Sequence, residues 1–281
     1  MEPSMDGKTI LITGATNGIG LVAARELARL GAQTIIVGRS PEKCAGVIEQ
    51  IKYETGNPEV EFIAADLSTR DGVQHTAHEF KKRHTRLDVL LNNAGALFLP
   101  RQVTQDGIEM TFALNHLNYF HLTILLLDIL KASGPGRIVN VSSDAHQGAK
   151  MNFDDLQYEK HYRGLTAYAQ SKLANVLFTY ELARKLESTK LTTNVLHPGL
   201  VNTGFAKNNG WLVKSCMALL SPFQRKPEEG AQTSIYLASS PEVEGTTGKY
   251  FVDEKSVPSD PASYNRAAAE RLWQVSLEMI A

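Results

Sequence analysis

The sequence has little cysteine and no hydrophobic run long enough to cross a membrane. Its 281 residues include two cysteines, Cys44 and Cys216, which are far apart and lack metal-binding spacing. This pattern excludes a disulfide framework, argues against a metal site and indicates a reducing compartment. The most apolar run, 122–127, is followed by Asp128 and is far shorter than the roughly 20 residues that a transmembrane helix needs. We interpret it as a buried helix.

The sequence also lacks an excess of charge of either sign. Its formal net charge is −1, and 43% of its residues are hydrophobic. This composition does not indicate disorder or a nucleic-acid partner. The polar N-terminal stretch 1–8 is too short for a signal peptide, so we expect a soluble, cytoplasmic protein. The length suits one large α/β domain, and no shift in composition divides residues 1–281 into two domains.

Short apolar segments alternate with helical segments along the whole chain. Seven of them have the pattern of strands, at residues 8–13, 33–38, 60–65, 87–91, 137–142, 192–197 and 248–252. The alternation predicts an α/β fold: a single-domain, doubly wound (Rossmann) arrangement in which helices cover both faces of a mostly parallel seven-stranded sheet. Residues 204–226 follow the sixth strand and carry large apolar side chains. They are a candidate substrate lid, or an ordinary helix packed on the core.

A glycine-rich turn follows the first strand. Gly14, Gly18 and Gly20 are spaced G-x-x-x-G-x-G and lead into a predicted helix at 21–30. A strand, a glycine turn and a helix in this order point free backbone N–H groups at a phosphate. Gly14 permits the tight turn, and the other two glycines let the backbone approach a pyrophosphate. The alternative is a plain glycine-rich turn.

The ends of the second and third strands bear on the choice of dinucleotide. Arg39 stands where an acidic residue would bind the 2′-hydroxyl of an adenosine ribose, and no acid occurs there. With Lys43 one turn into the next helix, Arg39 can accept a 2′-phosphate, which favours NADP(H); the alternative is a surface arginine at a strand end. Asp66 follows the third strand. It either accepts from the adenine amino group or caps the helix that begins near Thr69.

Small and polar residues follow the next two strands. Asn92-Asn93-Ala94-Gly95 ends the fourth strand and suits close approach of a cofactor. Asn115 lies inside a helix predicted over 104–132, where it is a local hydrogen-bond partner or holds a water near the active site. Ser142 and Ser143 end the fifth strand, at the sheet edge where ligands of open α/β folds bind. The alternative is that both hydroxyls serve turns or helix caps.

Tyr168 and Lys172 lie four residues apart on a predicted helix, so they share one face. An ammonium beside a phenol favours the phenolate and can lower the tyrosine pKa from about 10. Such a tyrosine can exchange a proton with a substrate oxygen near neutral pH. The alternative is a Tyr–Lys pair on a solvated helix face.

Together, these motifs resemble those of the short-chain dehydrogenase/reductase family over nearly the whole chain. They occur in the family's order: Thr13-Gly14-x-x-x-Gly18-Ile19-Gly20, Asp66-Leu67, Asn92-Asn93-Ala94-Gly95, Asn115, Ser142-Ser143, Tyr168-x-x-x-Lys172, and Pro198-Gly199 with Thr203. The segments 167–178 and 197–203 are similar to the retinol dehydrogenase branch of that family. Members of that branch are typically NADP(H)-preferring carbonyl reductases and alcohol dehydrogenases that act on lipophilic substrates.

The resemblance implies a role for each matching residue. Tyr168 would be the general acid and base, and Lys172 would hold the nicotinamide ribose and lower the tyrosine pKa. Ser143, or its neighbour Ser142, would hydrogen-bond the substrate oxygen, and Asn115 would support a water relay to the lysine. The implied NADP(H) site comprises Gly14, Thr16, Asn17, Gly18, Ile19, Gly20, Arg39, Asp66, Leu67, Asn93, Ala94, Gly95, Tyr168, Lys172, Pro198, Gly199, Val201 and Thr203.

The resemblance also implies a reaction. Membrane-bound retinol dehydrogenases usually carry an apolar anchor before the glycine motif, whereas only seven residues precede the first strand here. We therefore expect a soluble, NADP(H)-dependent oxidoreductase that interconverts an alcohol and a carbonyl on an apolar small molecule by hydride transfer. One alternative is a catalytically weak, NADP(H)-sensing protein that acts through a protein partner. Another is enone reduction or epimerisation, because a fold does not determine a substrate. Helix 116–131 could pair with a second subunit in a homodimer or homotetramer, or lie in the core.

Overall fold

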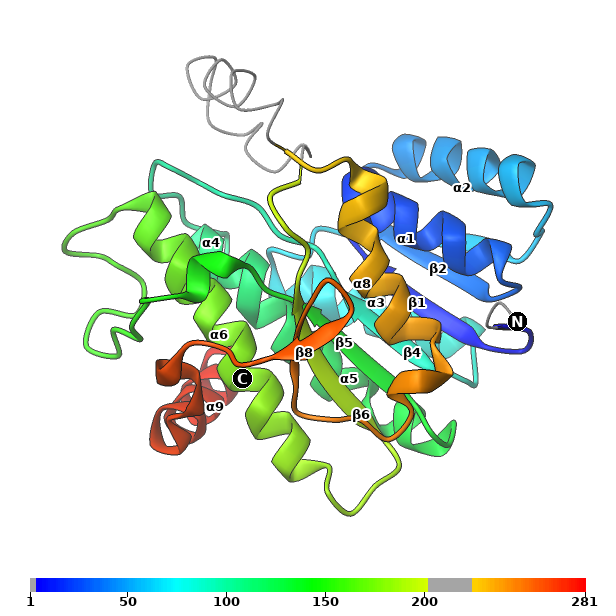
Figure 1. Cartoon of the computed structure of the whole chain (residues 1–281). Coiled ribbons are helices and arrows are strands. Elements are labelled where there is room, and N and C mark those ends of the chain that lie inside the picture. The colour runs from blue at the N-terminus through cyan, green and yellow to red at the C-terminus, as the bar shows by residue number, and fades with distance from the viewer. Residues whose placement is uncertain (1–3, 202–223) are drawn as a thin grey trace.

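The computed structural model describes residues 4–201 and 224–281 (Figure 1). Of the candidate lid, only residues 224–226 lie within these ranges, and Thr203 lies outside them. In the described ranges, no helix is both long enough and apolar enough to cross a bilayer.

The sheet confirms the predicted α/β class, but it contains eight strands rather than seven. In spatial order the strands are β3, β2, β1, β4, β5, β6, β7 and β8, and all neighbours are parallel except β7 and β8. Their bounds are β1 Thr9–Thr13, β2 Gln33–Gly38, β3 Val60–Ala64, β4 Val89–Asn92, β5 Arg137–Val141, β6 Thr192–His197, β7 Tyr250–Val252 and β8 Lys255–Val257. The seven predicted strands correspond to β1 through β7.

The missed strand, β8, is a short antiparallel edge strand. It follows a two-residue turn in which Asp253 and Glu254 both have positive φ, 48° and 63°. Positive φ at both central residues is the requirement of the tight hairpin turns that match strand twist. Neither residue is a glycine, and two of the three residues of β8 are exposed. The sequence therefore carried neither the usual turn signal nor an apolar pattern for this strand.

Helices cover both faces of the sheet, as predicted. Alternate residues of a strand point to opposite faces, so Ile10 and Ile12 of β1 pack in one buried cluster and Leu11 in another. The first cluster is covered by α1 (Gly18–Arg29), α2 (Pro41–Thr55) and α8 (Pro227–Ser239), which lie together on one face in Figure 1. The second is covered by α3 (Arg70–Arg83), α5 (Asn118–Ala132) and α6 (Gly164–Lys185).

The helix predicted over 104–132 is shorter and interrupted. It consists of a turn, α4 (Met110–Phe112), then a π-helical segment at Ala113–Leu117, and then α5. The carboxylate of Glu109 begins it by accepting from the N–H groups of Thr111 and Phe112, both at 2.8 Å. π-helical turns are rare and often occur at functional sites, and this one contains Asn115.

The C-terminal helix α9 (Arg266–Ile280) packs on the same side as α5 and α6. Trp273 of α9 contacts Phe120 of α5 and Phe178 of α6, with ring centroids 5.0 and 6.0 Å apart. Part of the apolar surface of α5 is thus covered by the chain's own helix. That surface was the basis for expecting subunit pairing through 116–131, which stays a prediction.

Candidate active site

The glycine turn between β1 and α1 is pressed against the end of β4. Gly14 and Gly18 have φ values of +66° and +56°, which disfavour residues with a side chain. A Cβ atom on Gly14 would lie 2.7 Å from the Cα of Ala94, and one on Gly20 would lie 2.5 Å from the Nδ2 of Asn93. The glycine spacing is therefore required by close contact between two strand ends, and not only by the turn itself.

Thr13 and Asn93 connect those two strand ends. The hydroxyl of Thr13 accepts from the backbone N–H groups of Asn93 and Ala94, at 2.8 and 3.0 Å. The Asn93 amide donates to the carbonyls of Thr13 and Gly14, at 2.8 and 3.2 Å. The side chain of Asn93, predicted to touch a cofactor, is thus used to hold the glycine turn in place. Thr13 was noted in the motif but not in the predicted site.

The end of β2 carries a cation at the protein surface. Arg39 is exposed, and among the described residues it makes no ion pair. A Cβ atom on the neighbouring Gly38 would lie 2.5 Å from the Cγ2 of Thr16, so the glycine turn also touches this strand end. The predicted cofactor residues Thr16 and Arg39 therefore lie on one side of the same turn.

The structure decides one alternative left open for Asp66. The cap of α3 is Thr69, whose hydroxyl accepts from the N–H of Gly72 at 3.1 Å. Asp66 is exposed, and its carboxylate accepts from the N–H and the hydroxyl of Ser68 at 3.0 and 2.8 Å. Asp66 is therefore not the helix cap, and contact with an adenine stays a prediction.

The two serines after β5 have different surroundings. The Ser142 hydroxyl is buried and donates to the backbone carbonyl of Lys172 at 2.7 Å. The Ser143 hydroxyl accepts from the N–H of Ala145 at 3.2 Å and hydrogen-bonds the hydroxyl of Tyr168. Of the two, Ser143 is the one that faces the tyrosine, while the hydroxyl of Ser142 connects the end of β5 to α6 through its hydrogen bond.

Lys172 is almost completely buried, with 3% of its surface exposed. Its ammonium donates to the carbonyl of Val141 at 3.1 Å and lies 5.6 Å from the ring centroid of Tyr168. The ring centroid of Tyr119 lies 5.8 Å from the same nitrogen. Burial lowers the pKa of Lys172 to about 7, because the ammonium loses its hydration and, within residues 4–201 and 224–281, pairs with no carboxylate.

Burial also raises the pKa of Tyr168 above its usual value near 10, and the hydrogen bond from Ser143 opposes this only in part. The expected lowering of the tyrosine pKa by Lys172 is therefore wrong for this structure. The physical reason is that both groups are desolvated, and a lysine with a pKa of about 7 carries only part of its charge near neutrality.

The side chain of Asn115 holds the loop after β4 in place through hydrogen bonds to its backbone. Its amide oxygen accepts from the N–H of Ala96 at 2.9 Å, and its amide nitrogen donates to the Ala96 carbonyl and the Ser171 hydroxyl at 3.0 and 3.1 Å. A Cβ atom on Gly95 would lie 3.1 Å from the Asn115 oxygen and 3.5 Å from the Lys172 nitrogen. Ser143, Tyr168, Lys172 and Asn115 are thus brought into one neighbourhood.

The loop after β6 reaches the start of α1. Gly199 has a φ of +85°, and Val201 pairs with Arg225 across an isolated bridge. A Cβ atom on Gly230 would lie 2.4 Å from Val201 and 3.3 Å from Ile19. Two predicted cofactor residues from distant segments, Ile19 and Val201, are therefore neighbours.

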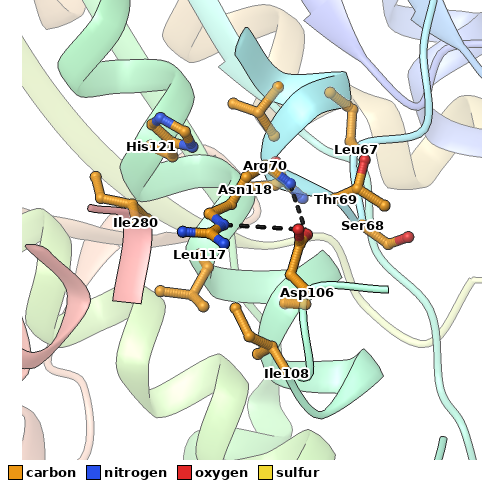
Figure 2. Close-up of a pocket in the computed structure, with 12 residues that line it drawn as sticks. Leu67, Ser68, Thr69, Arg70, Asp106, Ile108, Leu117, Asn118, His121 and Ile280 are labelled. Carbon is orange, nitrogen blue, oxygen red and sulfur yellow. Dashed lines mark hydrogen bonds and ion pairs between the residues drawn. The ribbon is translucent and has the colours of Figure 1, made fainter. Parts of the chain in front are cut away.

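A separate small cavity lies between α3, α5 and α9. Its volume is about 20 Å³, which suits roughly one water molecule. Figure 2 shows Arg70 and Asp106 facing each other at its edge, where the Arg70 N–H donates to the Asp106 carboxylate at 2.8 Å. Its lining includes Leu67 but none of the residues around Tyr168. Within the described ranges, no cluster of His, Cys, Asp or Glu could hold a metal ion.

Three buried polar residues near the site were not predicted. Asn175 and His116 hydrogen-bond each other. The hydroxyl of Tyr119 is buried and has no hydrogen-bond partner in the described part of the chain. Each is a polar residue at a helix position that packs against the core. The sequence alone did not show which face of each helix is buried, so these residues could not be assigned to the site.

Comparisons with known proteins agree with this architecture. Residues 8–211 match the family model described as short chain dehydrogenase. Human retinol dehydrogenase 14 is 44% identical over 98% of this chain and 87% of its own length. Human polyprenol dehydrogenase is 45% identical over 99% of this chain and 86% of its own length.

Solved structures show the same fold. An uncharacterised protein from Mycobacterium paratuberculosis superposes with a TM-score of 0.81 at 31% identity, over 99% of this chain and 95% of its own. Pseudomonas aeruginosa RhlG, solved as an NADP active-site complex, superposes with a TM-score of 0.71 at 26% identity, over 94% of this chain and 100% of its own. The chain belongs to the short-chain dehydrogenase family, as its motifs predicted. Its relatives include retinol dehydrogenases of the 12, 13 and 14 types.

Proposed function

We propose that the protein is an NADP(H)-dependent oxidoreductase that interconverts an alcohol and a carbonyl on an apolar small molecule. The observation that carries this proposal is the contact between the Ser143 hydroxyl and the partly buried Tyr168, with the buried ammonium of Lys172 beside the tyrosine ring. Two hydroxyls that meet at the carboxyl edge of a parallel sheet can both reach one substrate oxygen. Relatives named for retinol and polyprenol, both long apolar alcohols, support an apolar substrate.

The residues present fit a nicotinamide dinucleotide. Gly14 and Gly18 have positive φ and no side chains, so the turn can bring its backbone close to a phosphate. The N-terminus of α1, which favours anions, is part of the same turn. Arg39 is exposed at the end of β2 and free of ion pairs in the described ranges, so it is available for a 2′-phosphate. When bound, the cofactor supplies or accepts the hydride.

The proton is handled by the protein's own side chains. In the direction of reduction, Tyr168 donates its phenolic proton to the substrate oxygen while Ser143 hydrogen-bonds the same atom. Because burial raises the pKa of Tyr168, its hydroxyl is protonated at neutral pH and ready to donate. Lys172, with a pKa of about 7, can carry a proton in either direction near neutrality.

The first experiment is a titration of the purified protein with NADPH and with NADH, followed by nicotinamide fluorescence. Tight NADPH binding, weak NADH binding and NADPH consumption with at least one apolar aldehyde, ketone or quinone are the expected results. Binding of neither nucleotide would refute the cofactor assignment. Binding without turnover of any carbonyl would instead favour a nucleotide-sensing role.

Arg39→Asp should weaken NADPH binding about 10- to 100-fold while leaving NADH binding within about twofold. A charge-assisted hydrogen bond contributes about 1.5–3 kcal/mol, and each 1.4 kcal/mol is a factor of ten. Arg266→Asp is the matched control, because Arg266 is also exposed but lies at the start of α9. An unchanged ratio of the two affinities in Arg39→Asp would remove Arg39 from the 2′-phosphate site.

A further inference from the structure

A continuous hydrogen-bonded network connects the C-terminal helix to the surroundings of Lys172. His116 is fully buried in the π-helical segment, with its Nδ1 3.2 Å from the Oδ1 of Asn175 and its Nε2 3.1 Å from the hydroxyl of Ser276 on α9. Asn175 and Ser276 are themselves fully buried. The rings of Phe112 and Phe178 lie 5.0 and 6.1 Å from the imidazole, so the network runs through an otherwise apolar core.

The donors and acceptors of this network follow from its geometry. The Asn175 amide nitrogen donates to the carbonyls of Asn115 and Val141, at 2.9 and 3.3 Å. The amide oxygen of Asn175 therefore faces His116 and can only accept, so Nδ1 of His116 carries the hydrogen. Nε2 must then accept from the hydroxyl of Ser276. Burial lowers the pKa of His116 to about 4, which keeps the imidazole neutral at physiological pH.

The network meets Lys172 at one atom. The carbonyl oxygen of Val141 accepts both from Asn175 and from the Lys172 ammonium, which is 3.1 Å away. The second carbonyl held by Asn175 belongs to Asn115, whose side chain flanks Lys172 across Gly95. Asn175 thus orients two backbone carbonyls close to the Lys172 ammonium, those of Val141 and Asn115.

We propose that His116, Asn175 and Ser276 are positioning residues for Lys172, and that through them α9 determines where the ammonium lies relative to Tyr168. Each of the three acts through the next: Ser276 on His116, His116 on Asn175, and Asn175 on the carbonyl that Lys172 contacts. A single neutral tautomer can link a hydroxyl donor on one side to an amide acceptor on the other, which gives the chain of hydrogen bonds one direction. The expected change in turnover rests on the proposed function, whereas the expected change in the position of the Lys172 ammonium does not.

The test replaces the hydroxyl at the far end of the network. Ser276→Ala should move the NMR signal of the Lys172 ε-carbon at pH 7, assigned by its loss in Lys172→Met. The other titratable groups that face this ammonium, the phenols of Tyr119 and Tyr168, are unchanged. We also expect kcat for aldehyde reduction to fall about tenfold, because a small misplacement of a catalytic group is costly, while KM and NADPH affinity stay within about twofold. Ser276→Thr, which keeps the hydroxyl, should restore both readouts.

A matched control separates positioning from simple stability. Trp273→Leu removes the packing of α9 on Phe120 and Phe178 but leaves Ser276 and its hydrogen bond in place. It should lower Tm while leaving the Lys172 signal and kcat unchanged well below the transition. In wild-type protein labelled with ¹⁵N-histidine, His116 should show the neutral tautomer protonated on Nδ1 throughout pH 5–8.

The possible outcomes are distinct. A His116 tautomer protonated on Nε2, or a Lys172 signal in Ser276→Ala that matches wild type, overturns the proposal whatever the activity. A moved Lys172 signal with unchanged kcat would support the positioning of Lys172 by α9 and overturn the expected consequence for the reaction. If the wild-type protein reduces no carbonyl but the signal responds to Ser276→Ala, the proposed function fails and the positioning of Lys172 by α9 stands.

Discussion

Tyr168→Phe should reduce kcat for aldehyde reduction by at least about 1,000-fold while NADPH affinity stays within about twofold. General acid catalysis contributes roughly 10² to 10⁴ in rate, and phenylalanine keeps the ring but removes the proton donor. The ring contact with the Lys172 ammonium, 5.6 Å from centroid to nitrogen, is retained. NADPH absorbance in single-turnover reactions gives the rate, and fluorescence titration gives the affinity.

Tyr180→Phe is the matched control. Tyr180 lies on the same helix, α6, and its hydroxyl also has a hydrogen-bonded partner, the hydroxyl of Ser259 at 2.7 Å. That pair lies away from Ser143 and Lys172, so kcat should stay within about threefold of wild type and any loss should appear as lower Tm. Turnover by Tyr168→Phe at a rate near wild type would refute the assignment of Tyr168 as the general acid.

Lys172→Met should abolish turnover and, at pH 6–7, raise the free energy of unfolding by about 1–3 kcal/mol. A buried ammonium without a carboxylate partner destabilises the fold, and methionine fills a similar volume with an apolar chain. Activity and stability are therefore expected to change in opposite directions. The lost hydrogen bond to the Val141 carbonyl limits the gain, but Asn175 still donates to that oxygen at 3.3 Å.

The stability difference should depend on pH in a defined direction. Burial depresses the pKa of Lys172 to about 7 from an unfolded value near 10.5. Between these values the unfolded chain binds one more proton than the folded chain, so wild-type stability rises with pH across this window. Below about pH 7 both states bind the proton, and the full burial penalty applies. The advantage of Lys172→Met should therefore be largest at pH 6–7 and shrink toward pH 10.

Urea unfolding of both proteins at pH 6, 7, 8.5 and 10 measures this difference, and other groups that titrate in the window cancel between them. Lys190→Met is the control, because Lys190 is exposed and its removal should leave the pH dependence of wild type unchanged. If the free energies of unfolding of wild type and Lys172→Met differ by the same amount from pH 7 to 10, the pKa of Lys172 is not lowered by burial.

Much of the fold could be predicted because its signals are local. The apolar strand segments and the helical periods each depend on neighbouring residues, and β1 through β7 were found within two residues of their observed starts and ends. The edge strand β8 was missed because its turn, Asp253-Glu254, uses positive φ without glycine. The π-helical segment at Ala113–Leu117 was missed because an α-helical pattern does not reveal one extra residue in a turn.

The sequence by itself determined the family, the doubly wound sheet and the neighbourhood of Tyr168 and Lys172, since four residues on a helix span one turn. Only the tertiary structure decided which serine faces the tyrosine, that Thr69 rather than Asp66 caps α3, and that burial outweighs the lysine in the pKa of Tyr168. It also joined His116 to Ser276 across 160 positions of sequence. Desolvation and long-range hydrogen bonds depend on which surfaces meet, and no local pattern records that.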